Sequence, residues 1–176
     1  MKTILLLRHA KSAWNDTRLS DHERPLNRRG ERAARTIADH LAQNGPRPDL
    51  ILCSTATRAR QTLVPLIKRL GTPPPPLSLE DALYLASEGN LLARLQALAD
   101  DVATVLLVAH NDGIWQLAEA LAGRGPAAPL AALREKYPTG TLAVLQTPAG
   151  NWRDLAAGSG ELVAFVRPRD LTRRRG

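Results

Sequence analysis

Two histidines and two arginines lie at or shortly after the ends of short apolar runs of the kind that form buried strands. Arg8 and His9 follow an aliphatic run at the start of the chain, Arg58 lies shortly after a second run, and His110 follows a third. Ligands of open α/β sheets bind just beyond the carboxyl ends of the strands, so we expect these side chains to share one edge of a sheet. Guanidinium groups bind phosphoryl oxygens through paired donors, and a neutral imidazole can act as a nucleophile. The pattern therefore indicates a pocket that binds a phosphoryl group.

Each of these residues also has a simpler interpretation. Arg8 and His9 could merely end a strand, and a single histidine at a strand end is commonly a structural hydrogen-bonding group. Paired histidines could also bind a metal ion, but the arginines would repel a cation, and no carboxylate directly adjoins His9 or His110 in the sequence. We therefore expect no metal ion and no cofactor. A helix that begins just before Arg58 would add backbone donors and a positive field, which favours an anion.

The elements that must position these residues alternate between strands and helices. Short aliphatic runs predict strands, and apolar residues at helical spacing predict helices. The expected strands lie near 3–7, 50–53, 77–79, 103–108, 141–146 and 162–166, and the expected helices near 30–44, 55–70, 87–98, 113–121 and 130–136. Pro65 should kink the second helix or shift its start, and Gly123 should end the fourth. This alternation is typical of an α/β fold, a three-layer α/β/α sandwich with a mostly parallel sheet. The turn at 148–151 indicates at least one late antiparallel pairing.

The length and composition suit one folded domain over 1–176. The chain has 176 residues with 44% hydrophobic but only 3% aromatic content, so aliphatic side chains must build the core and platforms for stacking nucleic-acid bases are scarce. The net charge of +7 favours an anionic partner, such as a phosphorylated substrate, nucleic acid or a membrane surface. Part of this charge lies in a basic C-terminal tail over about 167–176, which we expect to be flexible and solvated.

Two features of the sequence bear on the cellular compartment. Cys53 is the single cysteine, so no disulfide can form within the chain, and its place in an apolar run favours the core over a nucleophile. The segment before Arg8 is too short for a signal peptide, and no apolar run approaches the ~18 residues of a membrane span. We therefore expect a cytoplasmic protein with no membrane partner.

Short motifs along the chain resemble, in the same order, those of a known enzyme family. The stretch 8–15 resembles the Arg-His-Gly signature of the histidine phosphatase superfamily, which includes the phosphoglycerate mutases. The stretch 54–62 resembles its second motif, Ser-x-x-x-Arg-Ala-x-Gln-Thr, and 108–111 resembles its Gly-His-Asn motif. The stretches 21–26 and 81–84 resemble the small SixA-like branch, the phosphohistidine phosphatases. The resemblance covers about 1–121 and implies a phosphoglycerate mutase-like fold.

The sequence departs from the family pattern at the motifs and between them. Ala10 and Ala109 stand where the family has glycine, and both are small residues. The stretch between Arg58 and His110 is too short for the long substrate-covering insertions of the phosphoglycerate mutases. The resemblance therefore argues against mutase activity and favours a small, open site.

The resemblance implies that His9 is a nucleophile. Attack by His9 on phosphorus would form a phosphohistidine, which water then hydrolyses. The nearby arginines should lower the pKa of His9 and keep it neutral. Arg8, Arg58 and His110 would bind the phosphoryl oxygens and stabilise their charge. Asn15 is either a further contact to phosphate or to His9, or a loop residue that caps a turn.

A leaving alkoxide also requires a general acid. By position in the family pattern the candidates are Asp81 and Glu80, of which we favour Asp81, and the alternative is a solvated acidic turn. Imidazole leaves more easily than an alkoxide, so a dispensable acid would indicate a phosphohistidine or phosphoramidate substrate.

The expected function is a metal-independent phosphatase. Its substrate would be a phosphohistidine protein or a small phosphate monoester. Two other classes are a phosphate-binding module without turnover and a basic nucleic-acid-binding protein. The complete set of arginines and histidines argues against the first. The second would require binding through Arg173, Arg174 and Arg175, and we expect a solvated tail there instead. The partner protein and the oligomeric state stay open.

Overall fold

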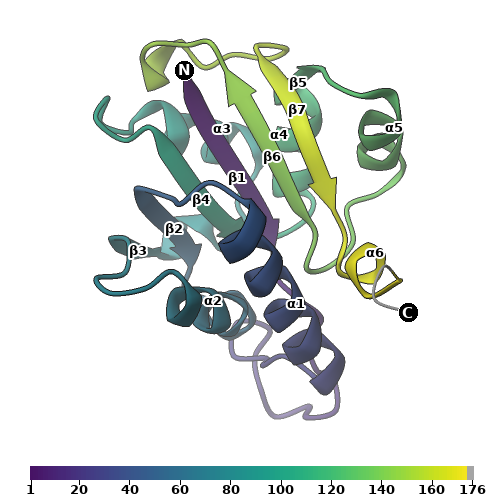
Figure 1. Ribbon diagram of the computed structural model, residues 1–176. Helices are drawn as coiled ribbons and strands as arrows, with labels where there is room; N and C mark the ends of the chain where they lie inside the picture. The colour runs from purple at the N-terminus through teal and green to yellow at the C-terminus, as the bar shows by residue number, and fades with distance from the viewer. Residues whose placement is uncertain (174–176) are drawn as a thin grey trace.

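The fold is built on a seven-stranded sheet within the residues that the structure describes, 1–173. In this computed structural model the strand order is β3-β2-β4-β1-β6-β7-β5 (Figure 1). The strands are β1 (Lys2–Arg8), β2 (Leu50–Ser54), β3 (Leu77–Glu80), β4 (Thr104–Ala109), β5 (Ala122–Arg124), β6 (Leu142–Thr147) and β7 (Gly160–Val166). The helices are α1 (Arg28–Asn44), α2 (Thr57–Arg69), α3 (Glu88–Gln96), α4 (Gly113–Leu121), α5 (Ala127–Glu135) and α6 (Pro168–Arg173), with short 3-10 helices η1 (Asp81–Leu83) and η2 (Trp152–Asp154).

β1 occupies the centre of the sheet, between β4 and β6. It pairs in parallel with β4, β4 pairs in parallel with β2, and β2 pairs in parallel with β3. β6 runs antiparallel to both β1 and β7. The mostly parallel sheet and the late antiparallel pairing are thus confirmed. Arg8 lies opposite Ala109, and Cys53 lies opposite Val108, so β1, β2 and β4 end at the same edge of the sheet.

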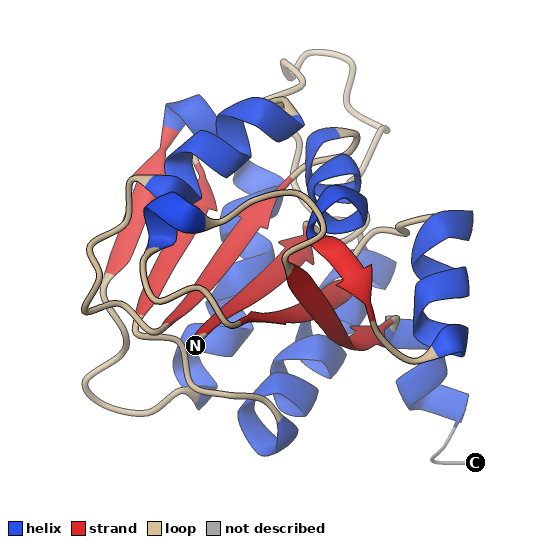
Figure 2. Ribbon diagram, turned by 90° about the horizontal axis from the view of Figure 1, so that it is seen from above, coloured by secondary structure: helices blue, strands red, loops and turns tan. Residues whose placement is uncertain are grey.

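Helices cover both faces of the sheet and give the expected three layers. Successive residues of β1 point to opposite faces: Leu5 and Leu7 pack with α1 and α2, whereas Ile4 and Leu6 pack with α3 and α4. Figure 1 shows α1 and α2 in front of the sheet with α3 and α4 behind it, and Figure 2 shows helices on both sides of the strands from above. A central strand buried on both faces is a rigid support for the residues at its end.

The edge of the sheet contains a strand that the sequence did not predict. Gly123 was expected only to end a helix, but it lies in β5, which pairs in parallel with β7. A Cβ at Gly123 would collide with the carbonyl oxygen of Gly158, so glycine is needed for this close approach of two backbones. The second helix, α2, begins at Thr57 and continues through Pro65.

The C-terminal segment also differs from expectation. Pro168–Arg173 form α6, where we predicted a flexible tail. Pro168 occupies the first helical position, where the missing N–H has no intrahelical partner to lose, and Leu171 packs against the core that α1 and α2 cover. The tail prediction is therefore wrong for these residues, while Arg174 and Arg175 lie outside the described part of the chain. None of the described helices is long and apolar enough to cross a membrane.

Candidate active site

Arg8, His9, Arg58 and His110 line one cavity of about 350 Å³, which we call the histidine cavity. Arg8 ends β1, His9 and His110 directly follow β1 and β4, and Arg58 lies in the first turn of α2. The backbone N–H of His9 donates to the carbonyl oxygen of Ala109 at 3.2 Å, which ties the ends of β1 and β4 together. The structure thus brings together the residues that the sequence placed at strand ends. The cavity is further lined by Lys11, Ser12, Trp14, Asp21, Arg24, Leu85, Asn111 and Thr139.

The hydrogen bonds of His9 define which ring nitrogen is available. Its side chain is buried, and Nδ1 lies 2.7 Å from the carbonyl oxygen of Ala10. A carbonyl oxygen only accepts, so Nδ1 must carry the proton and donate it. Nε2 then keeps its lone pair, and the Nε–H of Arg58 points to it at 3.4 Å. His9 therefore presents an unprotonated Nε2 beside a guanidinium group.

Burial and positive charge keep His9 neutral. Burial lowers the pKa of His9 to about 4, and Arg58, Arg8 and Arg24 add to this shift by repelling a second cation. The sequence predicted this direction from the arginines alone. Burial is the larger cause, because the ring is surrounded by protein at the end of a fully buried strand.

His110 lies against His9 and is also neutral. The two ring centroids are 5.0 Å apart, and His110 is 1% exposed. Burial, followed by the neighbouring His9 and Arg58, lowers the pKa of His110 to about 3. Its Nε2 is 2.8 Å from the hydroxyl oxygen of Ser54, which fixes the ring plane. Nδ1 is buried and has no hydrogen-bond partner among the described residues, so it remains available to a ligand atom.

Asp21 holds the guanidinium group of Arg58 in place. Arg58 is 3% exposed and donates to the carbonyl oxygen of Asp21 at 2.6 Å and to its carboxylate at 3.0 Å. The same carboxylate accepts from the hydroxyl of Tyr84 at 2.5 Å and from Arg24 at 2.6 Å. The Tyr84 hydroxyl and the two arginines hold the pKa of Asp21 well below its usual range. Asp21 is thus a permanent anion at neutral pH.

Arg8 projects into the cavity from the end of β1. It donates from Nη1 to the carbonyl oxygen of Tyr137 at 2.8 Å. The Tyr137 hydroxyl donates in turn to the carbonyl oxygen of Leu6 at 2.7 Å, which links this support to β1 itself. Nε of Arg8 is buried without a hydrogen-bond partner among the described residues. Arg8 therefore retains a donor for a ligand.

Asp21 and Arg24 were not among the site residues chosen from the sequence. Both belong to the stretch 21–26, which the family resemblance had marked without assigning roles. Arg24 is 8% exposed, and its Cζ lies 3.3 Å from the centroid of the Trp14 ring, a cation–π contact at the mouth of the cavity. That resemblance was the only signal in the sequence that could have identified them.

The structure does not bring the other three candidates into the cavity. Asn15 is exposed and does not line it. Asp81 is exposed and accepts a hydrogen bond from Thr55 at 2.6 Å. Glu80 is paired with Arg94 at 2.8 Å. Among the described residues, Asp21 is the one carboxylate that lines the cavity.

Metal-binding side chains do not cluster in the described part of the chain. No group of three or more histidine, cysteine, aspartate or glutamate side chains lies in a position to hold a metal ion there. Cys53 is buried, and burial raises the pKa of its thiol to about 12, which suits a core residue rather than a thiolate nucleophile.

Comparison with known proteins agrees with the motifs. Residues 4–84 match the model of the histidine phosphatase superfamily (branch 1). The chain is 41% identical over 165 residues to an uncharacterised protein of Mycobacterium tuberculosis, a match that covers 93% of this chain and 100% of the relative.

Two solved structures, both described as provisional phosphohistidine phosphatases SixA, share the fold. The protein from Nakamurella multipartitia has a TM-score of 0.81 and 32% identity, covering 95% of this chain and 96% of its own. The protein from Agrobacterium tumefaciens has a TM-score of 0.80 and 34% identity, covering 95% and 98%. The family and the phosphoglycerate mutase-like fold expected from the motifs are confirmed, and the chain belongs to branch 1 of the histidine phosphatase superfamily.

Proposed function

We propose that this protein is a metal-independent phosphatase that uses His9 as its nucleophile. Nε2 of His9 attacks the phosphorus of the substrate, so a P–N bond forms while the bond from phosphorus to the leaving group breaks. Water then attacks the phosphohistidine, the P–N bond breaks, and inorganic phosphate leaves. The observation that carries this proposal is the fixed tautomer of His9. The carbonyl oxygen of Ala10 holds the Nδ1 proton, and Nε2 faces Arg58.

The unpaired donors of the cavity support phosphoryl binding. Nε of Arg8 and Nδ1 of His110 are buried without partners, and each such group costs free energy until a ligand atom satisfies it. The phosphoryl oxygens are the acceptors that we assign to Arg8 and Arg58. Because His110 is neutral, its ring can donate from one nitrogen only. We assign the Ser54 hydroxyl as the donor to Nε2, which places the proton of His110 on Nδ1, where it would donate to the phosphoryl group.

The charges of the cavity replace a metal ion in this mechanism. Positive side chains around a phosphoryl group stabilise the negative charge that its oxygens carry in the transition state. Asp21 does not cancel this field, because its carboxylate is already bound by Arg58, Arg24 and Tyr84. Its role is to position Arg58.

The leaving group must depart with little help from a carboxylic acid. Asp21 is too strong an acid to hold a proton at neutral pH, and Asp81 lies outside the lining of the cavity. Asp81 could act only if the substrate reached it over the edge of the cavity. The arrangement therefore favours leaving groups that need little protonation, such as the imidazole of a phosphohistidine protein or an aryl oxide. A simple alkyl phosphate is a poorer substrate. A cytoplasmic location, where phosphorylated proteins and metabolites occur, is part of the proposal.

Hydrolysis assays in EDTA test the proposal directly. Nitrophenyl phosphate and a phosphohistidine protein serve as substrates, and we expect His9→Ala to abolish turnover of both. His40→Gln, a change in α1 outside the histidine cavity, is the matched control and should retain activity. Rapid quenching should trap an acid-labile phosphoenzyme in the wild type and none in His9→Ala.

Two results would contradict the proposal. Equal rates for the wild type and His9→Ala would remove His9 as the nucleophile. Tight binding of inorganic phosphate with no turnover of either substrate and no phosphoenzyme would show a phosphate-binding module instead.

A further inference from the structure

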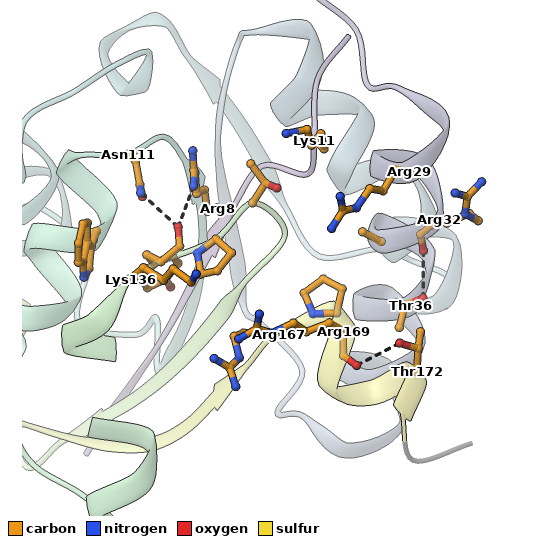
Figure 3. A pocket seen from close by; sticks show the side chains of 16 residues that line it. Arg8, Lys11, Arg29, Arg32, Thr36, Asn111, Lys136, Arg167, Arg169 and Thr172 are labelled. Atoms are coloured by element: carbon orange, nitrogen blue, oxygen red, sulfur yellow. Dashed lines mark hydrogen bonds between the residues drawn. The ribbon is translucent and has the colours of Figure 1, made fainter. Parts of the chain in front are cut away.

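A second cavity, of about 690 Å³, adjoins the histidine cavity, and we call it the cationic cavity. Figure 3 shows it between α1, α6 and the segment that precedes β6. Arg8, Lys11, Asn111 and Thr139 line both cavities, so the two spaces share a wall. The remaining lining residues are Arg29, Arg32, Ala33, Thr36, Trp115, Lys136, Tyr137, Pro138, Arg167, Pro168, Arg169 and Thr172.

The lining of the cationic cavity carries only positive charge. Its charged residues are Arg8, Lys11, Arg29, Arg32, Lys136, Arg167 and Arg169, and no aspartate or glutamate is among its lining residues. Asp170 pairs with Arg167 and Arg169, and Asp112 attracts Arg8, but both lie outside the lining. Gathering this many cations around one space raises the potential there and attracts an anion.

Several of these cations have no partner among the residues that the structure describes. Among the described residues, the side chains of Lys11, Arg29 and Lys136 make no hydrogen bond or ion pair. The carboxamide oxygen of Asn111, on the wall shared with the histidine cavity, is buried without a partner, while its nitrogen donates to the carbonyl oxygen of Tyr137 at 3.2 Å. These three cations are exposed, so an anion can reach them without breaking an ion pair, whereas the Asn111 oxygen is an acceptor and does not contribute to anion binding.

Close packing of α1 and α6 against the rest of the chain forms the walls of the cationic cavity. A Cβ at Gly30 would collide with the carbonyl oxygen of Lys11, so glycine allows the start of α1 to lie against the loop after β1. This contact places Arg29 beside Lys11. Leu171 anchors α6 on the core and so positions Arg167 and its neighbours. In Figure 3, Arg29 extends from α1 into the space that Lys136 borders on the opposite side.

We propose that the cationic cavity is a second anion subsite, which binds a further phosphate group of a small substrate while the scissile phosphoryl group lies in the histidine cavity. This inference rests on the proposed function. Arg8, which lines both spaces, is the residue between the two anions. The substrate class is thus a small molecule whose leaving group itself carries a phosphate.

The shape of the cavity favours a small molecule over a protein partner. Its volume of about 690 Å³ falls within the range of small-molecule sites. Its walls come from five separate segments, near 8–11, 29–36, 111–115, 136–139 and 167–172, so they surround a small ligand on several sides. An acidic segment of a phosphohistidine protein would instead contact the exposed rim, and this alternative is an outcome of the test.

Binding of unreactive analogues tests the subsite without turnover. Hexane bisphosphonate carries two phosphonates and hexyl phosphonate carries one, and calorimetry on the whole protein compares their affinities. We expect the bisphosphonate to bind the wild type about tenfold more tightly, the effect of satisfying unpaired cationic donors. The double variant Arg29→Gln/Lys136→Gln should lose this preference.

The matched control is Arg28→Gln/Arg134→Gln. It removes the same net charge from the same two regions, but neither residue lines the cavity, so the preference should persist. Equal affinities of the two phosphonates for the wild type would overturn the inference. So would an equal loss of preference in both double variants, which would indicate general charge attraction.

A turnover assay separates failure of this inference from failure of the proposed function. Nitrophenyl phosphate and its phosphonomethyl-substituted derivative share one leaving-group chemistry and differ by one anion. His9-dependent hydrolysis of both with equal kcat/KM supports the proposed function and contradicts the subsite. The double variant Arg29→Gln/Lys136→Gln could instead lose kcat/KM for a phosphohistidine protein alone, while the two phosphonates bind the wild type with equal affinity. The cavity would then serve a protein surface, and the inference would be wrong.

Discussion

Mild acid should destabilise this protein through the two buried histidines of the site. Burial and nearby positive charge lower the pKa of His9 to about 4 and that of His110 to about 3. In an unfolded chain a histidine has a pKa of about 6.5. Between these values both rings are neutral in the folded protein and protonated in the unfolded chain. The unfolded state then binds more protons, so the free energy of unfolding falls as the pH decreases below about 6.5.

The size of the effect follows from the number of protons. Each extra proton bound by the unfolded state changes the free energy of unfolding by about 1.4 kcal/mol per pH unit. Two histidines therefore give a slope of about 2–3 kcal/mol per pH unit near pH 5. The free energy of unfolding of a typical domain is only about 5–15 kcal/mol, so a decrease of one pH unit removes a substantial part of the stability.

Urea unfolding between about pH 7 and about pH 5 measures this slope. His9→Gln and His110→Gln should each halve it near pH 5, because each removes one of the two protons. Imidazole NMR titration of the folded wild type supplies a direct check, since both rings should stay neutral at about pH 5. A free energy of unfolding that is flat over this range, or a ring that titrates near its ordinary pKa, would refute the reasoning.

Three further predictions concern residues around the site. Asp21→Asn removes the anion that anchors Arg58. Because Asp21 is partly exposed, we expect its loss to cost only about 1–2 kcal/mol of transition-state stabilisation, which lowers kcat/KM about tenfold. The same change at exposed Asp101 should leave kcat/KM unaltered. Asp81→Asn should change kcat for nitrophenyl phosphate by less than about twofold, because the residue does not line the cavity; a tenfold loss would assign it as the acid. Leu171→Ala should lower the free energy of unfolding in urea by about 1–2 kcal/mol and weaken bisphosphonate binding by loosening α6; unchanged binding would show that α6 does not build the subsite.

The strand ends could be predicted because their signal is local. An aliphatic run that stops at Arg8 and His9 shows both a buried strand and its polar end within a few residues. Once three such runs are placed in a parallel sheet, His110 and His9 fall at the same edge, and the observed pairing of β1 with β4 makes them neighbours. Arg58 was also predicted from the run that precedes it, and it lies in the first turn of α2 rather than at a strand end.

The loop residues of the site could not be placed in the same way. Asp21 lies in a polar loop without periodicity, and it reaches Arg58 and Tyr84 only because distant elements fold together. Asp81 and Asn15 show the converse, since their position near a motif did not determine where their side chains lie. In α6, the arginines dominate the composition, and Pro168 and Leu171 are the only local signs of a packed helix.

The same arginines serve both the chemistry and the choice of substrate in this scheme. Burial and the neighbouring Arg58 and Arg8 lower the pKa of His9, and under the proposed function the same two arginines would attract the phosphoryl group that Nε2 attacks. A leaving group that bears its own phosphate gains from the cations beyond Arg8, and its negative charge develops where the cationic cavity begins. Stabilisation of that charge by fixed cations can replace a proton from a carboxylic acid. In this scheme the positive lining of the cationic cavity takes the place of the proton-donating carboxylic acid that the histidine cavity lacks among its described lining residues.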